Sequence, residues 1–309
     1  MAENTPTLSV GLAVYNGERF LREAVDSILS QTFSDFELII SDNASSDRTE
    51  AICRDYAARD GRIHYHRNAT NIGGANNENQ TFRLSRGKYF RWAAHDDVCE
   101  PTLFEKAVAI LEENPDVVLC YSQSQAIDAA GKPLGITSWE KASGREPHRR
   151  FAALIRYDHH CEATYGVIRS EVMRRTRLQL NYTDSDRTLL AELSLYGRFV
   201  EIPEPLFRKR FHEGNVYDDW RGRMAWFDAA FANKIVFPHW LQFGDYFVTI
   251  GRVPLSASDK MRCYRAMVPW FFRYGKSMVK DVLVALKTLL GRTLAVLSGR
   301  RTGRERPVS

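Results

Sequence analysis

Short apolar runs alternate with segments of helical periodicity over the first 130 residues. The apolar runs have the length of β-strands and lie at 8–14, 37–40, 63–66, 89–94 and 117–122. The segments between them repeat apolar residues every three or four positions, at 18–30, 47–58, 77–85 and 101–113. This alternation predicts an α/β fold, with a mostly parallel central sheet and helices on both of its faces.

The pattern is looser from residue 131 onward. Residues 131–150 are polar and contain Gly, Pro and Ser, which predicts a surface loop. The pattern predicts further helices and short strands, the helices at 151–157, 170–176 and 184–196 and the strands at 164–168, 199–202 and 206–211. From residue 216 the chain is rich in aromatic residues and favours helices.

Basic residues are concentrated at the end of the chain. The net charge is +5, from 43 Lys and Arg against 38 Asp and Glu, but residues 260–309 hold twelve of the basic residues and only two of the acidic ones. The rest of the protein is therefore slightly acidic, which argues against a nucleic-acid-binding platform. A hydrophobic content of 44% suffices for a full core at this length.

The five cysteines are dispersed and show no CxxC spacing, so they predict neither a disulfide framework nor a zinc site. Such cysteine usage is typical of a reducing compartment, and we expect a cytoplasmic protein. The first residues lack the basic and then apolar layout of a signal peptide. No uncharged apolar stretch reaches the roughly 18 residues of a membrane-spanning helix.

Polar side chains gather where three of the predicted strands end. The first strand ends at 15–18, the second at 42–47, and the strand near residue 90 ends at His95, Asp96 and Asp97. In a parallel sheet these ends share one edge, where ligands bind. The adjacent carboxylates of Asp96 and Asp97 repel each other unless a cation neutralises them, which favours a divalent metal ion that also binds substrate phosphates.

No phosphate-binding glycine loop follows the first strand. Residues 15–18 match neither Walker A nor GxGxxG, which argues against P-loop chemistry and dinucleotide-dependent redox chemistry. A phosphate ligand would be held by a metal ion instead. That arrangement is typical of chemistry in which the diphosphate of a nucleotide sugar is the leaving group.

Several motifs occur together in one order and spacing. They are VYNGERFL at 14–21, SILSQTF at 27–33, ELIISDNASSDRT at 37–49, NIGG at 71–74, Asn79, GKY at 87–89 and His95-Asp96-Asp97. With these motifs the chain resembles the inverting family-2 glycosyltransferases of the bacterial surface-polysaccharide type, which have the GT-A fold. The resemblance is strong over 8–125 and weaker to about residue 215.

The resemblance implies a donor-binding half at 1–130 and an acceptor-binding half with the catalytic base at 131–215, and the pattern and charge of the rest predict a helical basic extension at 216–309. It implies that a nucleotide-sugar donor is bound by Tyr15, Asn16, Glu18, Asp42, Asn71, Gly73 and Asp96. The first three would line the base and ribose pocket, and Asp42 would hydrogen-bond the base. Asn71 and Gly73 would flank the donor, and Asp96 would face the ribose or the sugar.

The same resemblance implies that Asp97 binds a divalent metal ion, Mn²⁺ or Mg²⁺, that holds the diphosphate. Three positions depart from the family pattern, namely Asn43 in place of the second Asp of an Asp-Asp pair, Ala94 in place of an Asp, and Glu78 where an Arg is common. We therefore expect two carboxylates at the end of the fourth strand rather than three.

Inversion at the anomeric carbon needs one base that takes the proton of the acceptor hydroxyl. In the family this base is a carboxylate that opens a helix ending in Gly, and residues 186–197 resemble that helix. The family spacing falls on Asp186, with Asp184 as the competitor, and one of the two would act only as a helix cap.

The segment at 208–215 resembles the part of the family that closes over the donor. Arg208 and Arg210 would add positive charge there, and His212 would approach the metal ion or the diphosphate. Three further residues, His159, His160 and Cys161, precede a predicted strand that would face the acceptor, and we consider them as acceptor contacts.

Residues 278–297 place apolar side chains on one stripe at helical spacing. The stripe consists of Val279, Val282, Leu283, Leu286, Leu290, Thr293, Leu294 and Leu297. Basic residues flank it, and Trp270, Phe271 and Phe272 precede it as candidate interfacial anchors. This layout predicts peripheral contact with an anionic membrane through 270–309. A helix packed on the body or in a homodimer is the alternative.

These patterns predict a hexosyltransferase that moves a sugar from a nucleotide diphosphate to a glycan or lipid-linked acceptor, on the inner face of the cell membrane. A sugar nucleotidyltransferase is one alternative, but it would need a glycine-rich loop with a basic residue after the first strand. A non-catalytic protein that binds nucleotide sugars or polyanions is the other, but pure binding does not require Asp186 as well as Asp97.

Overall fold

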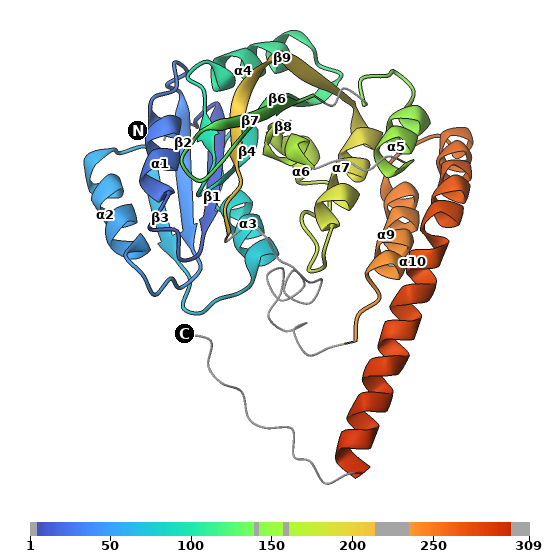
Figure 1. Ribbon diagram of the computed structural model, residues 1–309. Helices are drawn as coiled ribbons and strands as arrows, with labels where there is room; N and C mark the ends of the chain where they lie inside the picture. Colours follow the sequence, from blue (N-terminus) through green and yellow to red (C-terminus); the bar gives the residue numbers. More distant parts are fainter. Residues whose placement is uncertain (1–4, 139–141, 157–160, 214–234, 298–309) are drawn as a thin grey trace.

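The computed structural model describes residues 5–138, 142–156, 161–213 and 235–297, with side chains described up to residue 290. Its sheet has the strand order β3-β2-β1-β4-β8-β6-β9-β5, and β7 pairs with β6. Helices cover both faces of the sheet, and two C-terminal helices stand beside it (Figure 1). The predicted α/β architecture with a mostly parallel sheet is therefore confirmed.

The first four long strands are parallel to one another. They are β1 (Leu8–Val14), β2 (Phe36–Asp42), β3 (Ile63–Arg67) and β4 (Tyr89–Ala94), with β1 between β2 and β4. Every residue of β2 is buried. A parallel strand that is covered on both faces needs apolar side chains on both, which explains the continuous apolar runs in the sequence.

Helices pack on both faces of these four strands. One core contains side chains of α1 (Leu21–Leu29), α2 (Thr49–Arg59) and α4 (Leu103–Glu113) together with the sheet. The helix α3 (Gly74–Arg83) packs on the other face, against β1 and β2. Its close approach requires Gly11 in β1, because Thr81 occupies the place where a Cβ at that position would stand.

The second half extends the sheet. The long strands β6 (Val117–Ile127) and β9 (Arg198–Arg210) are parallel to each other, and the short β8 (Val167–Arg169) lies antiparallel between β4 and β6. A two-residue strand, β5 (Val98–Cys99), pairs with β9 at the edge. The sheet thus places the end of β9 close to the end of β4.

Three local expectations for this half are wrong. The loop predicted at 131–150 contains β7 (Pro133–Thr137), whose exposed residues hid it from the pattern. The strand predicted at 164–168 begins instead as the 3₁₀ helix η1 (Glu162–Tyr165), and only its end belongs to β8. The two strands predicted at 199–202 and 206–211 are one strand, β9, because a register shift opposite β6 accommodates its two prolines.

Five helices complete the described chain. They are α5 (Pro147–Arg156), α6 (Ser170–Met173), α7 (Ser185–Tyr196), α9 (Pro238–Arg252) and α10 (Ala257–Leu297). A third core joins α5, α7, α9 and the first half of α10. Figure 1 shows the rest of α10 running away from the sheet.

The C-terminal helices correct one expectation about the aromatic anchors. Trp270 is buried at 1% exposure against Phe243, Tyr246 and Tyr274, so it belongs to the third core and not to an exposed interface. Phe272 is exposed. The helices expected directly after residue 215 fall largely outside the described residues. Among the helices that are described, none is long and apolar enough to cross a membrane.

Candidate active site

Three strands end side by side at one edge of the sheet. Val14 of β1 pairs with Asp42 of β2, and Ala13 pairs with Ala94 of β4. The polar residues that follow these strands therefore line a single rim, as the sequence predicted.

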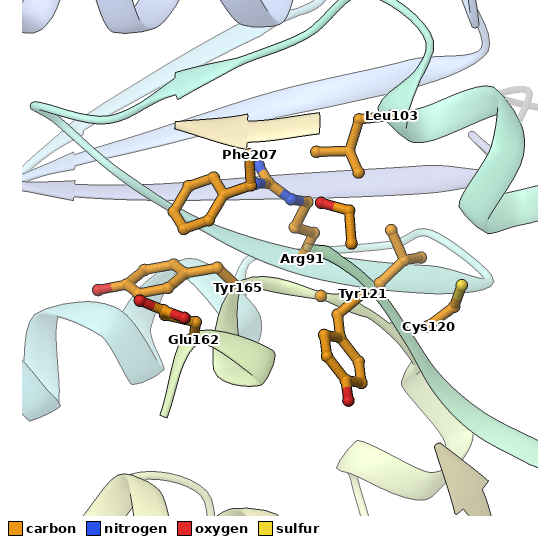
Figure 2. A pocket seen from close by; sticks show the side chains of 10 residues that line it. Arg91, Leu103, Cys120, Tyr121, Glu162, Tyr165 and Phe207 are labelled. Atoms are coloured by element: carbon orange, nitrogen blue, oxygen red, sulfur yellow. The ribbon is translucent and has the colours of Figure 1, made fainter. Parts of the chain in front are cut away.

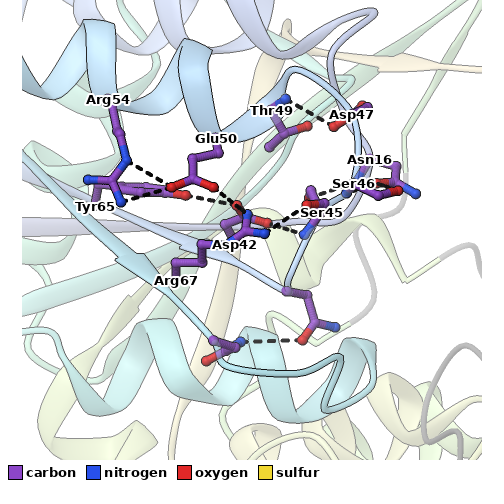
Figure 3. Close-up of polar contacts among 12 residues, drawn as sticks. Asn16, Asp42, Ser45, Ser46, Asp47, Thr49, Glu50, Arg54, Tyr65 and Arg67 are labelled. Carbon is purple, nitrogen blue, oxygen red and sulfur yellow. Dashed lines mark hydrogen bonds and ion pairs between the residues drawn. The ribbon is translucent and has the colours of Figure 1, made fainter.

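Asp42 is fully buried at the end of β2 and is bound by three donors of its own chain. Its Oδ1 accepts the backbone N–H of Ser45 at 2.8 Å, and its Oδ2 accepts the Tyr65 hydroxyl at 2.8 Å and the Arg67 guanidinium at 2.6 Å. Figure 3 shows these partners converging on the carboxylate. Burial and the charge of Asp42 raise the pKa of Tyr65. Asp42 thus fixes the turn after β2. Its hydrogen bond to the base of the nucleotide stays a prediction.

Asn16 and Glu18 bind the same turn from the end of β1. The Asn16 side-chain oxygen accepts the backbone N–H of Ser46 at 2.8 Å (Figure 3). A Glu18 carboxylate oxygen accepts the backbone N–H of Arg48 at 2.9 Å. Tyr15 differs from both, because its ring is 46% exposed on the rim. The geometry therefore leaves the Tyr15 ring as a surface on which a planar group can stack.

Asn43 holds the loop that contains Asn71 and Gly73. Its Nδ2 donates to Oδ1 of Asn71 at 2.8 Å, and its Oδ1 accepts the backbone N–H of Ile72 at 2.9 Å. The first of these bonds needs an amide donor, which explains an Asn where the family pattern has an Asp. Gly73 opens α3 at φ 84° and ψ 156°, a conformation that is essentially restricted to glycine.

The ends of β4 and β9 are joined through the acidic pair. Asp97 Oδ1 accepts the backbone N–H of Arg210 at 2.8 Å, and Arg210 Nε donates to the carbonyl of Asp96 at 2.8 Å. The Nε2 atom of His212 is hydrogen-bonded to Oδ2 of Asp96 at 3.0 Å. Asp96, Asp97 and His212, which come from distant parts of the sequence, thus lie together.

The two predicted arginines have protein partners. Arg210 is 2% exposed, with its guanidinium 2.7 Å from Glu23 and 4.7 Å from the centre of the Phe20 ring. Arg208 forms an ion pair with Glu100. Arg210 therefore holds the acidic pair in place through its hydrogen bonds to Asp96 and Asp97. A contact of either arginine with the nucleotide-sugar donor stays a prediction.

The rim carries an excess of negative charge. Burial and the charge of Asp96 raise the pKa of Asp97 to about 8. Burial and the charge of Asp186 raise the pKa of Glu78 to about 8. The raised pKa of Tyr165 reflects burial and the charges of all four carboxylates. The charge of Glu78 thus acts on Tyr165 together with the charges of the acidic pair and Asp186, and the sequence analysis did not assign Glu78 to the site.

Asp184 and Asp186 differ in their surroundings. Asp184 is the N-cap residue of α7, with φ 66° and a side chain that is 55% exposed. Asp186 lies in the first turn and is half-buried, and burial together with the charge of Asp184 raises its pKa. Cys161 is buried next to this turn, whereas His159 and His160 lie outside the described residues.

A small pocket behind the rim contains an arginine that the sequence analysis missed. Arg91 of β4 is fully buried, and its three guanidinium nitrogens have no hydrogen-bond partner among the described residues. Its charge lies 5.5 Å and 5.6 Å from the ring centres of Phe104 and Phe207. Figure 2 shows Arg91 reaching toward Phe207, with Tyr165 also lining the pocket. The only sequence signal was a charged residue inside an apolar strand.

Comparison with known proteins gives one family. The family model described as glycosyl transferase family 2 matches residues 9–174. A glycosyltransferase of Haemophilus influenzae is 28% identical over 219 residues, which are 68% of this chain and 67% of that protein. The glycosyltransferase MJ1057 of Methanocaldococcus jannaschii is 34% identical over 148 residues, 47% of this chain and 51% of its own. The matched segment thus spans about half to two thirds of these relatives.

Solved structures of the GT-A fold share this architecture. Staphylococcus aureus TarS 1–349 in complex with UDP aligns with a TM-score of 0.63 at 14% identity, covering 86% of this chain and 72% of that one. The mannosyltransferase PcManGT from Pyrobaculum calidifontis, in complex with GDP-Man and Mn²⁺, aligns with a TM-score of 0.56 at 15% identity, covering 94% and 76%. At these identities the likeness shows the fold alone.

Proposed function

The chain belongs to glycosyl transferase family 2 and is a glycosyltransferase with the GT-A fold, and from this premise we propose that it transfers a sugar with inversion from a nucleotide diphosphate to a hydroxyl acceptor. The observation that carries the proposal is that the charges of Asp96, Asp97 and Asp186, which come from both halves of the chain, all raise the pKa of Tyr165. The first pair suits the donor diphosphate and its metal ion, and Asp186 suits the base. The alternatives of a nucleotidyltransferase and a purely binding protein gain no support from the described contacts.

We propose that residues 1–130 bind the donor along the rim and that residues 131–215 form the acceptor side. The exposed Tyr15 ring would stack on the base, while Asn16, Glu18 and Asp42 hold the turn beneath it. The structural neighbours in complex with UDP and with GDP-Man support a nucleoside-diphosphate sugar as the donor class. The loop of Asn71 and Gly73 would flank the donor.

The donor set at the acidic pair fits a divalent metal ion. Among the described residues no group of three or more His, Cys, Asp and Glu side chains is arranged to hold one. Asp97, together with His212 that is hydrogen-bonded to Asp96, nevertheless offers oxygen and nitrogen ligands of the kind that Mn²⁺ accepts. Burial and the charge of Asp96 raise the pKa of Asp97, and a bound cation would favour its charged form. A bound ion would neutralise charge on the leaving diphosphate.

The proposed base acts in a single displacement. The acceptor oxygen forms a bond to the anomeric carbon while the bond from that carbon to the diphosphate oxygen breaks, and the bonding electron pair leaves with the diphosphate. The proton of the acceptor hydroxyl moves to the carboxylate of Asp186. Because burial and Asp184 raise the pKa of Asp186, this carboxylate is a stronger base than an exposed one.

Replacing the proposed base separates catalysis from binding. We expect Asp186→Asn to lower transfer by roughly 10²–10⁴-fold while donor binding, measured by calorimetry with Mn²⁺, is unchanged. Asp184→Asn removes a similar charge two residues away and should keep most of the activity. Full activity of Asp186→Asn, or loss of activity in the Asp184 variant alone, would show that Asp186 is not the catalytic base.

We further propose that the protein works on a lipid-linked acceptor at the inner face of a membrane. Val279, Leu283 and Leu290 of α10 are 59%, 60% and 64% exposed, whereas Met278 and Ala285 on the other side of the helix are buried. Deletion of 276–309 should abolish sedimentation with anionic vesicles. If full-length protein stays in solution with vesicles but forms a dimer by analytical ultracentrifugation, the homodimer alternative replaces this proposal.

A further inference from the structure

A basic groove lies between α5 and α10, on elements that carry none of the proposed donor or base residues. It has a volume of about 290 Å³, and its lining includes His148, Arg149, Arg156, Arg262 and Arg265. This volume is at the lower end of the range for small-ligand sites, so it suits a headgroup rather than a whole nucleotide sugar.

The positive charge of the groove is largely uncompensated. Arg149 forms an ion pair with Glu146. The side chains of Arg156, Arg262 and Arg265 form no ion pair or hydrogen bond with any other residue that the structure describes. The Nδ1 atom of His148 is buried, also without a partner among those residues. Arginine side chains gathered in one groove attract an anion, and their planar forks match the oxygens of a phosphate.

The acidic residue closest along α10 forms no ion pair with the arginines of the groove in the part of the chain that the structure describes. Asp259 lies three residues before Arg262, about one helical turn away, and its Oδ2 accepts the hydroxyl of Ser256. Arg150, on the opposite side of α5, is itself a buried cation that donates to the carbonyls of Ser194 and Arg145. Among the described residues, the ion pair of Arg149 with Glu146 is the one that an arginine of the groove forms.

The helix that supplies two of the arginines also exposes a long apolar stripe. Exposed side chains recur at steps of three, four and seven residues, at Met261, Val268, Phe272, Val279, Leu283, Leu286 and Leu290. Basic residues also occur along the same helix, at Arg262, Arg265, Arg273, Lys276, Lys280 and Lys287. An apolar stripe beside a basic one is the arrangement of a helix at a membrane surface.

We propose that the groove between α5 and α10 binds the phosphate group of an anionic membrane lipid. The adjacent apolar stripe favours a lipid over a free phosphate, because it places acyl-chain contacts beside the phosphate contacts on one face of α10. The proposal rests on the proposed membrane contact and is independent of the transfer chemistry.

The test compares two double variants of the full chain that lose the same charge. Arg262→Gln with Arg265→Gln changes the groove, and Lys280→Gln with Lys287→Gln changes the basic stripe outside it. Partitioning is measured on phosphatidylcholine vesicles with and without phosphatidate. Loss of two surface charges weakens partitioning about thirtyfold. We expect the groove variant to lose roughly tenfold more than the control, because each arginine makes charge-assisted hydrogen bonds to the phosphate.

The outcomes separate the groove from the membrane contact. Equal losses in both variants would overturn the groove and leave general electrostatic attraction. If phosphatidate does not increase the partitioning of the wild-type protein, the ligand is not an anionic lipid. If calorimetry then shows that inorganic phosphate binds the wild type but not the groove variant, the ligand is free phosphate. Donor binding by calorimetry stays normal in the groove variant in every case, so failure here is distinct from failure of the transferase proposal.

Discussion

Asn43 offers a sharp test of how the rim is built, because its amide cannot be replaced by the carboxyl group that the family pattern has at this position. Asn43 is 2% exposed, and its Nδ2 lies 2.8 Å from Oδ1 of Asn71. In Asn43→Asp an oxygen replaces this donor and faces the oxygen of Asn71. Rotation of the Asn71 amide would relieve the clash only by giving up the 2.9 Å bond from the backbone N–H of Gly73.

The expected loss follows from these contacts. One hydrogen bond contributes about 1 kcal/mol, and a buried acceptor left without a donor costs about 1–3 kcal/mol more. We therefore expect Asn43→Asp to lower the free energy of unfolding by about 2–4 kcal/mol. Burial raises the pKa of the introduced carboxyl group above its value in the unfolded chain, so the loss grows as the pH rises through that pKa.

Urea unfolding followed by tryptophan fluorescence, at acidic and at neutral pH, measures this difference. Asn76→Asp is the matched control. Asn76 is half-buried in the first turn of α3, and the substitution removes only the hydrogen bond from its Nδ2 to the carbonyl of Ile72. We expect the control to lose about 1 kcal/mol or less. If Asn43→Asp is as stable as the wild type at neutral pH, the bond to Asn71 does not hold the loop and the reasoning is refuted.

Further predictions concern other parts of the site. Gly73→Ala should lower stability by about 1–3 kcal/mol in thermal unfolding and weaken donor binding; Gly61→Ala, with open space around it, should change neither. Arg91→Met should keep or raise the melting temperature, because it removes a buried charge without hydrogen-bond partners among the described residues. The charge of Arg91 also lowers the pKa of Asp97, so calorimetry should show weaker Mn²⁺-dependent donor binding, and unchanged binding would show that Arg91 does not keep Asp97 charged. The acidic limb of the pH profile of kcat/KM should lie above the ordinary Asp pKa, because Asp186 must lose its proton; a limb at the ordinary value would contradict its role as base.

Much of the fold could be predicted because buried parallel strands leave a continuous apolar signal. β1, β2 and β4 are buried on both faces, and the apolar runs end with β1 and β4, whereas β2 continues past its run to the polar residues Ser41 and Asp42. β7 could not be found this way, since nearly all of its side chains are exposed and its sequence resembles a loop. The unbroken course of β9 depends on its register with β6, which no local pattern contains.

The site shows the same division between local and long-range information. The polar clusters after β1, β2 and β4 could be predicted, because they follow apolar runs. Their internal hydrogen bonds could not, since Asp42 meets Arg67 and Asp96 meets His212 only through the fold. Arg91 was missed because the unusual feature of this arginine is its complete burial, which the sequence does not reveal.

The stereochemistry of the sugar product tests the central claim most directly. Proton NMR of the anomeric signal, recorded early after the wild-type protein acts on its donor in the presence of Mn²⁺, reports the configuration at the anomeric carbon. A single displacement assisted by Asp186 predicts a product of inverted configuration, and no such signal from Asp186→Asn. A product of retained configuration would contradict a single displacement in which Asp186 is the base.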